Sequence, residues 1–118
     1  MDPITKKLLS FFFPKPPKMR YFELSFPSLD GTSDNIILYS LRSKKITNIV
    51  ITIVNDKKQK YQCSIPEIPG REEKHIGLSR FLNSSSLPFE GTIKKVKIVF
   101  EGGTENFIKE EETFIFTG

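Results

Sequence analysis

The chain has 118 residues, which is enough for one domain with a modest hydrophobic core. It contains 11 phenylalanines but neither alanine nor tryptophan, so its composition favours strands over helices. Its single cysteine, Cys63, excludes an internal disulfide and a cysteine-based metal site. The formal net charge of +4 lies within the first 20 residues, because residues 21–118 carry 13 basic and 13 acidic side chains.

The leader, residues 1–18, is predicted to be a short amphipathic helix followed by a stiff linker. Asp2 and Pro3 favour a helix start, because Asp caps free N–H groups and Pro is tolerated in the first turn. Pro14 ends the helical pattern, and Pro16-Pro17 favours an extended backbone. The candidate contact residues of the leader are large and apolar or basic: Leu8, Phe11, Phe12, Phe13, Lys15 and Lys18.

Three adjacent phenylalanines are costly to leave in water, so we expect the leader to be covered. It could dock on its own domain or on a second copy of the chain. It could also lie in the groove of a protein partner, or on an anionic membrane with its phenylalanines inserted. The sequence leaves these three interpretations open.

The apolar stretch Leu8–Phe13 is too short for a typical signal-peptide core, and no small-residue cleavage site follows it. No segment approaches the roughly 20 apolar residues of a membrane span. If Met1 is the native start, we therefore expect a soluble cytoplasmic protein.

From residue 19 onward the apolar side chains alternate with polar ones, which predicts β-structure. Phe22–Phe26 and Ile36–Leu41 are the first two predicted strands. Ile46–Val54 is almost entirely apolar or β-branched and is predicted to be a central strand buried on both faces. The next strand is predicted to turn three side chains inward: Tyr61, Cys63 and Ile65.

The second half of the chain continues the same pattern. Residues 74–78 form a short predicted strand, and residues 79–83 a single helical turn. Ile93–Phe100 is a strong predicted strand with Lys95 and Lys97 on its polar face, and residues 106–116 supply the last strand or two. Seven or eight short, evenly spaced strands predict an all-β fold, an antiparallel β-sandwich over residues 19–118.

The order of segments between residues 36 and 100 resembles the galactose-binding-like jelly rolls. A buried strand, Ile49–Ile53, is followed one turn later by Tyr61-Gln62-Cys63. The phrase His75-Ile76-Gly77-Leu78-Ser79-Arg80-Phe81 then leads, through a loop containing Phe89-Glu90-Gly91, to the strand Ile93–Phe100. That family includes bacterial carbohydrate-binding modules and the related domain of a complex I assembly factor.

The resemblance implies a jelly-roll sandwich and, as one functional alternative, a carbohydrate-binding module. Sugar-binding modules usually present tryptophan or tyrosine side chains to the sugar ring. This chain has no tryptophan, and Tyr21, Tyr39 and Tyr61 lie on predicted strands, so no binding residue is carried over from the family. An immunoglobulin-like sandwich is the alternative topology, although the Cys…Trp…Cys pattern of immunoglobulin domains is absent.

The sequence offers little for catalysis. His75 is the only histidine and lies on the polar side of a short predicted strand, so a Ser–His–Asp or Cys–His mechanism would rest on it alone. Cys63 is interpreted as a buried structural thiol. The run Glu110-Glu111-Glu112 could contribute to a calcium site, but we interpret it as a solvated turn or strand edge. We therefore expect no enzymatic activity, no metal and no cofactor.

Three groups of lysines raise the alternative of a nucleic-acid-binding β-domain. They are Lys44-Lys45, the turn with Lys57, Lys58 and Lys60, and the strand with Lys94, Lys95 and Lys97. The zero net charge of residues 21–118 disfavours this alternative, because phosphate affinity depends on summed positive charge. Lysines on edge strands also protect against edge pairing.

These observations predict a non-catalytic β-sandwich binding module, a protein-interaction or adaptor domain that uses its leader as the contact element. Its expected partner is another protein or a second copy of the chain. A glycan and a peripheral membrane contact are alternatives, and nucleic acid is the least favoured.

Overall fold

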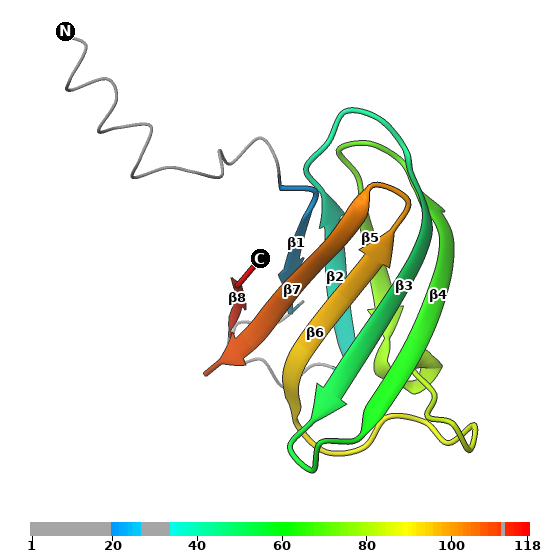
Figure 1. Ribbon diagram of the computed structural model, residues 1–118, viewed down its shortest axis with the longest axis vertical. Coiled ribbons are helices and arrows are strands. Elements are labelled where there is room, and N and C mark those ends of the chain that lie inside the picture. The colour runs from blue at the N-terminus through cyan, green and yellow to red at the C-terminus, as the bar shows by residue number, and fades with distance from the viewer. Residues whose placement is uncertain (1–19, 27–33, 112) are drawn as a thin grey trace, which may run out of the picture.

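The computed structural model describes residues 20–26, 34–111 and 113–118. Within these residues the chain forms eight strands in two antiparallel sheets and one 3-10 turn, Leu78–Arg80 (Figure 1). The predicted all-β class is confirmed, and the two sheets are compatible with the predicted sandwich. The predicted leader helix and its contact residues lie outside the described residues.

The smaller sheet has the strand order β1-β2-β5, and the larger sheet has the order β4-β3-β6-β7-β8. Every pair of neighbouring strands is antiparallel. The strands of the smaller sheet are β1 (Phe22–Ser25), β2 (Asn35–Ser40) and β5 (Glu73–Gly77). Those of the larger sheet are β3 (Ile46–Asn55), β4 (Lys60–Ile68), β6 (Ile93–Phe100), β7 (Gly103–Glu110) and β8 (Thr113–Phe116).

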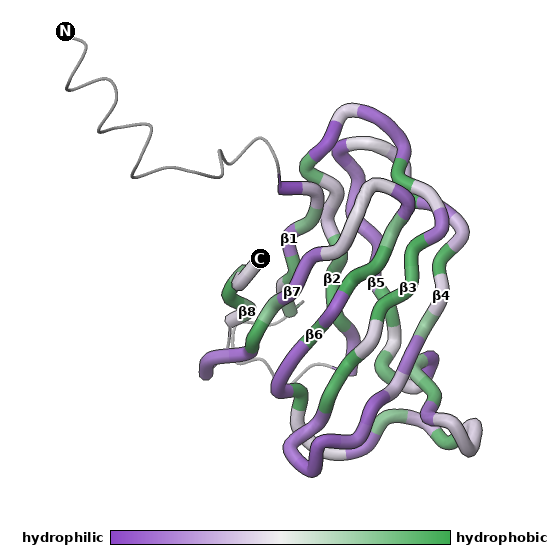
Figure 2. Tube along the Cα trace, in the orientation of Figure 1, coloured by the Kyte–Doolittle hydropathy of each residue, from purple (hydrophilic) through white to green (hydrophobic). Residues whose placement is uncertain are grey.

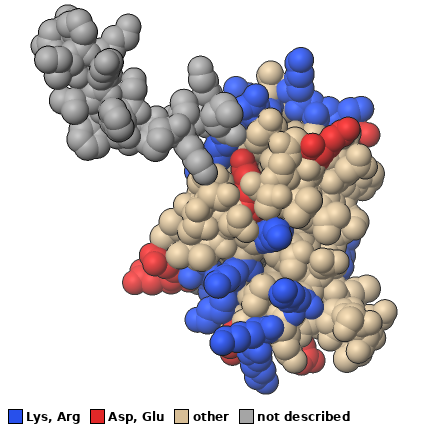
Figure 3. Space-filling view, viewed as in Figure 1, with Lys and Arg blue, Asp and Glu red and all other residues tan. Residues whose placement is uncertain are grey.

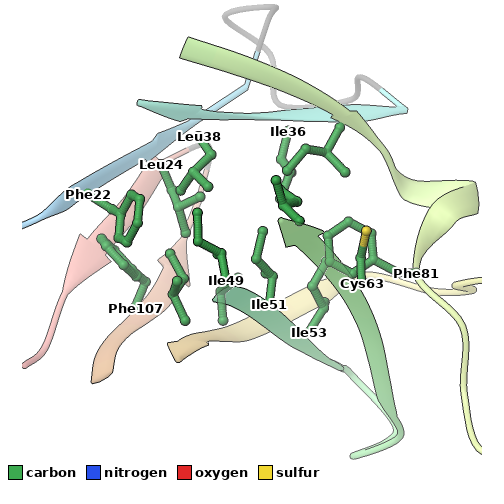
Figure 4. Packing of buried hydrophobic residues seen from close by; sticks show 14 of the residues in the cluster. Phe22, Leu24, Ile36, Leu38, Ile49, Ile51, Ile53, Cys63, Phe81 and Phe107 are labelled. Carbon is green, nitrogen blue, oxygen red and sulfur yellow. The ribbon is translucent and has the colours of Figure 1, made fainter. Parts of the chain in front are cut away.

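The hydrophobic core fills the space between the two sheets (Figure 4). The alternation expected for strands with one buried face is seen in β6, where buried and exposed residues alternate from Val96 to Phe100. Figure 2 shows both hydrophilic and hydrophobic residues along this strand. Tyr61, Cys63 and Ile65 of β4 are buried, as predicted. The largest fully buried side chains come from both sheets: Phe22, Phe81, Phe107, Ile36, Leu38, Ile49, Ile51, Ile53, Ile65, Ile68, Ile76 and Ile98.

The prediction that the third strand is buried on both faces is wrong. β3 is central in its sheet, since it pairs with both β4 and β6. Its outward residues Val50, Thr52 and Val54 are nevertheless only half-buried. The physical reason is that no described element covers the outer face of the larger sheet, so only the neighbouring side chains shield these residues. The predicted turn at residues 79–83 also begins one residue earlier than expected, at Leu78.

A left-handed residue changes the alternation at the start of β3. Ile46 and Ile49 are both buried although they are three residues apart, and Asn48 between them has a φ of 55°. Asn tolerates this left-handed conformation better than most residues. The pairing with β4 keeps one register across this point, from Ile46↔Ile68 to Ile49↔Ile65, so the left-handed residue turns both isoleucines to the core without an inserted residue.

A buried carboxylate fixes the first described strand to the larger sheet. Glu105 of β7 is 4% exposed, and its two carboxylate oxygens accept hydrogen bonds from the backbone N–H groups of Tyr21 (2.7 Å) and Phe22 (3.0 Å). Close by, the Arg20 guanidinium lies over the rings of Phe116 (4.7 Å) and Phe107 (5.5 Å). The start of the described chain, Arg20 to Phe22, is thus attached to the larger sheet by specific polar and cation–π contacts.

Replacement of Ile51 by alanine should lower the free energy of unfolding by about 2–5 kcal/mol, because it leaves a cavity in a fully buried position. Denaturant midpoints would measure the loss. The matched change Val50→Ala on the half-buried face of the same strand should cost clearly less. Equal losses of unfolding free energy in the two variants would contradict a core that lies on only one face of β3.

Burial raises the pKa of Glu105 above its ordinary value, while the two backbone N–H donors and the nearby arginines oppose that rise. A raised folded-state pKa means that the contribution of this group is greatest below its ordinary pKa and is lost as pH rises through the raised pKa. The stability of the native chain relative to Glu105→Gln should therefore fall as the pH rises from about 4 toward neutrality, because the native carboxyl is deprotonated at a cost that the amide does not bear. Denaturant titrations of both proteins across that range would test this, and an advantage that grows with pH would contradict it.

Candidate functional site

The outward face of the larger sheet carries a group of lysines interleaved with apolar and small polar residues. We call it the lysine face and define it by Lys58, Lys60, Lys95 and Lys97 with the side chains between them. A shallow hollow of about 500 Å³ lies among these four lysines, and no carboxylate of the described residues lines it. In Figure 3 lysine and arginine side chains gather over the lower part of this side.

Strand register explains how lysines that are distant in sequence meet on one surface. Val54 of β3 is paired with Lys60 of β4 on one side and with Lys95 of β6 on the other. Lys95 is in turn paired with Ile108 of β7. Because neighbouring strands lie about 4.8 Å apart, the backbones at the two lysines are separated by roughly 10 Å with the valine between them.

A second row of paired residues runs beside the first. Thr52 is paired with Gln62 and with Lys97, and Lys97 is paired with Asn106. The Gln62 amide Nε2 donates a hydrogen bond to Thr52 Oγ1 at 3.2 Å. The two rows therefore form a mixed surface of positive charge, β-branched side chains and hydrogen-bonding groups.

Asn55 holds the turn that carries Lys58. It is buried, and its Oδ1 accepts hydrogen bonds from the N–H groups of Lys57 (3.0 Å) and Gln59 (2.9 Å). Its Nδ2 donates to Gln59 Oε1 and to the Glu90 carbonyl, both at 2.9 Å. All the hydrogen-bonding capacity of this buried amide is used to fix the turn.

Lys58 itself adopts a left-handed backbone conformation, with a φ of 63°. Its N–H donates to the Asn55 carbonyl at 3.0 Å, as in hairpins whose turn ends in a left-handed residue. Glycine or asparagine is the usual residue at such a position. A lysine in this conformation therefore has a higher backbone energy than a glycine would have.

The acid in the same turn is occupied by the protein backbone. Asp56 Oδ1 accepts a hydrogen bond from the Thr92 N–H at 3.1 Å. This bond, with that of its own N–H and the charges of Lys57 and Lys94, lowers the pKa of Asp56. Asp56 stays ionised, and neither of its two lysine neighbours lines the hollow. Asp56 therefore does not neutralise the lysines that line the hollow.

A second hollow, of about 600 Å³, lies between β4 and the segment after the 3-10 turn, and we call it the amide hollow. Its sides are formed by Gln59, Lys60, Gln62, Leu82, Asn83 and Ser84. Asn83 Oδ1 accepts from the N–H groups of Ser85 (2.9 Å) and Leu87 (3.0 Å), which orients its amide. Among the described residues, Asn83 Nδ2 has no partner and remains able to donate to a ligand.

The other candidate residues do not converge on a catalytic site. His75 is exposed, and its Nε2 lies 3.0 Å from Glu73 Oε1. Cys63 is a buried free cysteine. Glu110 and Glu111 are exposed at the β7–β8 turn, as expected for a solvated edge. Within residues 20–26, 34–111 and 113–118, no group of three or more His, Cys, Asp or Glu side chains could hold a metal ion.

Comparison of the chain with protein-family models, curated proteins and solved structures finds no match. In the described part of the chain there is also no helix with the length and apolar content that crossing a membrane requires. The candidate sites therefore rest on geometry and charge alone.

Lys58→Gly should raise the free energy of unfolding by roughly 0.5–1 kcal/mol, because glycine adopts a positive φ without the steric cost of a side chain. Lys57→Gly is the matched control in the same turn, where no positive φ is found, and it should not stabilise the domain. Thermal or denaturant unfolding of the two variants would compare them. Equal effects would mean that the left-handed backbone at residue 58 is not strained.

Proposed function

We propose that this protein is a non-catalytic β-sandwich module that binds an acidic, partly apolar segment of a partner protein on its lysine face. The observation that carries the proposal is the hollow among four lysines, which is lined by no carboxylate from the described part of the chain. Charge complementarity of this kind steers association and selects among partners.

The apolar content of the lysine face favours a protein ligand. Val54 lies between Lys60 and Lys95, and Ile108 lies beside Lys95. Along the same sheet, Val99 and Ile115 are 39% and 40% exposed. A segment with alternating acidic and apolar side chains could pair its carboxylates with the lysines and bury its apolar side chains against these residues.

Single-stranded nucleic acid fits the same surface less well. Proteins that bind single strands stack bases on exposed aromatic rings. No aromatic side chain among the described residues is exposed, and the one that lines the hollow, Phe107, is buried. The zero net charge of residues 21–118 also weakens long-range attraction to phosphates.

The strand order supports the immunoglobulin-like alternative rather than the jelly roll. In immunoglobulin-type sandwiches the first, second and fifth strands of the common core lie together, and the third, sixth and seventh form the other sheet, with an additional strand beside the third. The orders β1-β2-β5 and β4-β3-β6-β7 follow that pattern, and β8 extends it. We therefore infer an immunoglobulin-like connectivity for this domain.

A peptide-display selection against the full chain tests the proposed function. The expected result is enrichment of peptides in which Asp or Glu alternates with apolar residues. Chemical-shift changes on binding should map to Thr52, Val54, Lys95 and Lys97. Binding should weaken as ionic strength rises from about 0.05 to about 0.3 M, because the charges on this face are exposed to solvent.

The decisive variant is Lys60→Ser/Lys95→Ser/Lys97→Ser, which should weaken binding of a selected peptide at least about tenfold. The matched control, Lys44→Ser/Lys45→Ser/Arg71→Ser, removes the same charge far from the lysine face and should change binding by less than about twofold. If both variants lost the same affinity, the binding would depend on net charge and not on the lysine face, and the proposal would be overturned. Tighter binding of single-stranded oligonucleotides than of any peptide would replace it with nucleic-acid binding.

The amide hollow supports a second candidate function, binding of a neutral carbohydrate. Sugar hydroxyls need a mixture of donors and acceptors, and the hollow offers amides, a hydroxyl and the exposed Leu82. A glycan array probed with the full chain should give saturable binding. The variant Gln62→Ala/Asn83→Ala should abolish this binding, whereas Lys95→Ser/Lys97→Ser, which leaves the amide hollow unchanged, should preserve it. An array without saturable binding would remove this candidate.

A further inference from the structure

We propose that the outer face of the smaller sheet is the docking surface for the lysine face of a second copy of this chain. We call it the acidic face and define it by Glu23, Ile37, Tyr39, Glu73 and His75. The inference rests on the proposed binding role of the lysine face, and it names a second occupant for that surface.

Strand register places a tyrosine between two glutamates on the acidic face. Tyr39 of β2 is paired with Glu23 of β1 on one side and with Glu73 of β5 on the other. Both glutamates are exposed and the tyrosine is half-buried. Because successive side chains of a strand alternate between faces, these three residues lie opposite the buried side chains of the same strands.

A second row of paired residues runs beside the first. Ile37 is half-buried and is paired with Ser25 on one side and with His75 on the other. His75 Nε2 lies 3.0 Å from Glu73 Oε1, so the two rows are in contact. The acidic face therefore combines carboxylates with apolar and hydrogen-bonding side chains, as the lysine face combines lysines with them.

The acidic face has an excess of negative charge. Its two glutamates give a formal charge of −2, one from each carboxylate, because the histidine is counted as neutral. Within the described strands β1, β2 and β5 there is one lysine or arginine, Lys74. It is paired with the buried Leu38 and therefore projects to the core side of the sheet.

The charged residues that flank these strands in the chain do not cancel that excess. Arg71 and Glu72 precede β5 as one cation and one anion, and Asp34 and Arg80 do the same at the other end of the sheet. The remaining two arginines are directed to the larger sheet. Arg20 lies over Phe107 and Phe116 of that sheet, and Arg42 lies 4.6 Å from the centre of the Tyr21 ring, which packs on Phe100.

The charged rows of the two faces have the same spacing. Val54 lies between Lys60 and Lys95 just as Tyr39 lies between its two glutamates. Because neighbouring strands are about 4.8 Å apart, each pair of like charges is separated by roughly 10 Å across one half-buried side chain. A second copy can therefore bring two carboxylates to two lysines while Tyr39 packs on Val54.

The fold determines how copies would be arranged. The core lies between the two sheets, so the acidic face and the lysine face point in opposite directions (Figure 1). One copy cannot present both faces to the same neighbour, and a two-fold dimer would place like charges together. The contact is therefore head-to-tail and can continue from copy to copy.

Each contact between copies should be weak. Three strands of about five residues cover an area of only roughly 14 Å by 17 Å, at a strand spacing of about 4.8 Å and a rise of about 3.4 Å per residue. Two such faces bury far less than the roughly 1,200 Å² of a stable interface. Association is therefore expected at protein concentrations of about 0.1–1 mM, where it would compete with a partner segment for the lysine face.

Sedimentation velocity of the full chain, at about 0.02–1 mM in about 0.05 M salt, tests the inference. The weight-average sedimentation coefficient should rise past the value of a dimer, and the rise should disappear near 0.3 M salt, because the charges are exposed. Glu23→Lys/Glu73→Lys should weaken association at least about tenfold. The matched control Glu67→Lys/Glu101→Lys makes the same charge change beside Thr47, far from both faces, and should alter it less than about twofold.

The decisive test mixes two variants that each keep one face. Glu23→Lys/Glu73→Lys keeps the lysine face, and Lys60→Ser/Lys95→Ser/Lys97→Ser keeps the acidic face. Each variant alone should stay monomeric, whereas an equimolar mixture should form a 1:1 complex and no larger species. A mixture that stays monomeric although thermal unfolding shows both variants to be folded would overturn the inference.

Chemical-shift changes in the mixture should locate the contact. They are expected at Thr52 and Val54 when the first variant carries the isotope label, and at Ile37 and Tyr39 when the second variant carries it. Changes confined to other surfaces would mean that the copies associate in another way, and would also overturn the inference.

A peptide selected on the lysine face distinguishes this inference from the proposed function. Glu23→Lys/Glu73→Lys should bind that peptide within about twofold of the native affinity, because its lysine face is unchanged. Saturating peptide should also dissociate the native assemblies. A native chain that binds the peptide but never self-associates would overturn the second-copy inference alone, whereas a chain that does neither would overturn both.

Discussion

The position of β3 between β4 and β6 is the constraint on which the larger sheet depends. On its inner side it supplies Ile49, Ile51 and Ile53, which are fully buried. On its outer side the same register places Val54 between Lys60 and Lys95. Because successive side chains of a strand point to opposite faces, a slip of one residue would exchange core and surface along the whole strand. The core and the proposed contact face are therefore specified by one set of backbone pairings.

Much of this fold could be predicted from sequence, because alternation is a local property. The inward set Tyr61, Cys63 and Ile65 and the outward pair Lys95 and Lys97 follow directly from the period of two. The error at β3 came from the same rule: a run of β-branched residues indicates a strand but does not distinguish a covered face from an uncovered one. Whether a face of the sheet is covered depends on how distant segments pack, which the local sequence does not show.

The polar residues that hold the structure were invisible in the sequence for a related reason. Asn55 ends β3 beside a hairpin turn, yet it is buried; three of its four hydrogen bonds lie within that turn, and the fourth joins the turn to Glu90, 35 residues away. Glu105 lies in a strand where an acid would ordinarily face solvent, and its partners are 83 and 84 residues away in sequence. The bonds of Glu105 and the bond from Asn55 to Glu90 form only once the sheets have assembled, so residue type and spacing give no signal for them.

The attachment of Tyr21 and Phe22 to Glu105 also has a mechanical consequence. Any tension applied through the leader reaches the folded domain at these two residues. It is borne first by two N–H···O bonds to β7 and by the antiparallel ladder between β1 and β2. β1 has only four residues, so it is the element that such a pull would detach first, while the β3–β6–β7 sheet remained intact. A partner that held residues 1–18 would therefore act on the described domain first at its shortest N-terminal strand, β1.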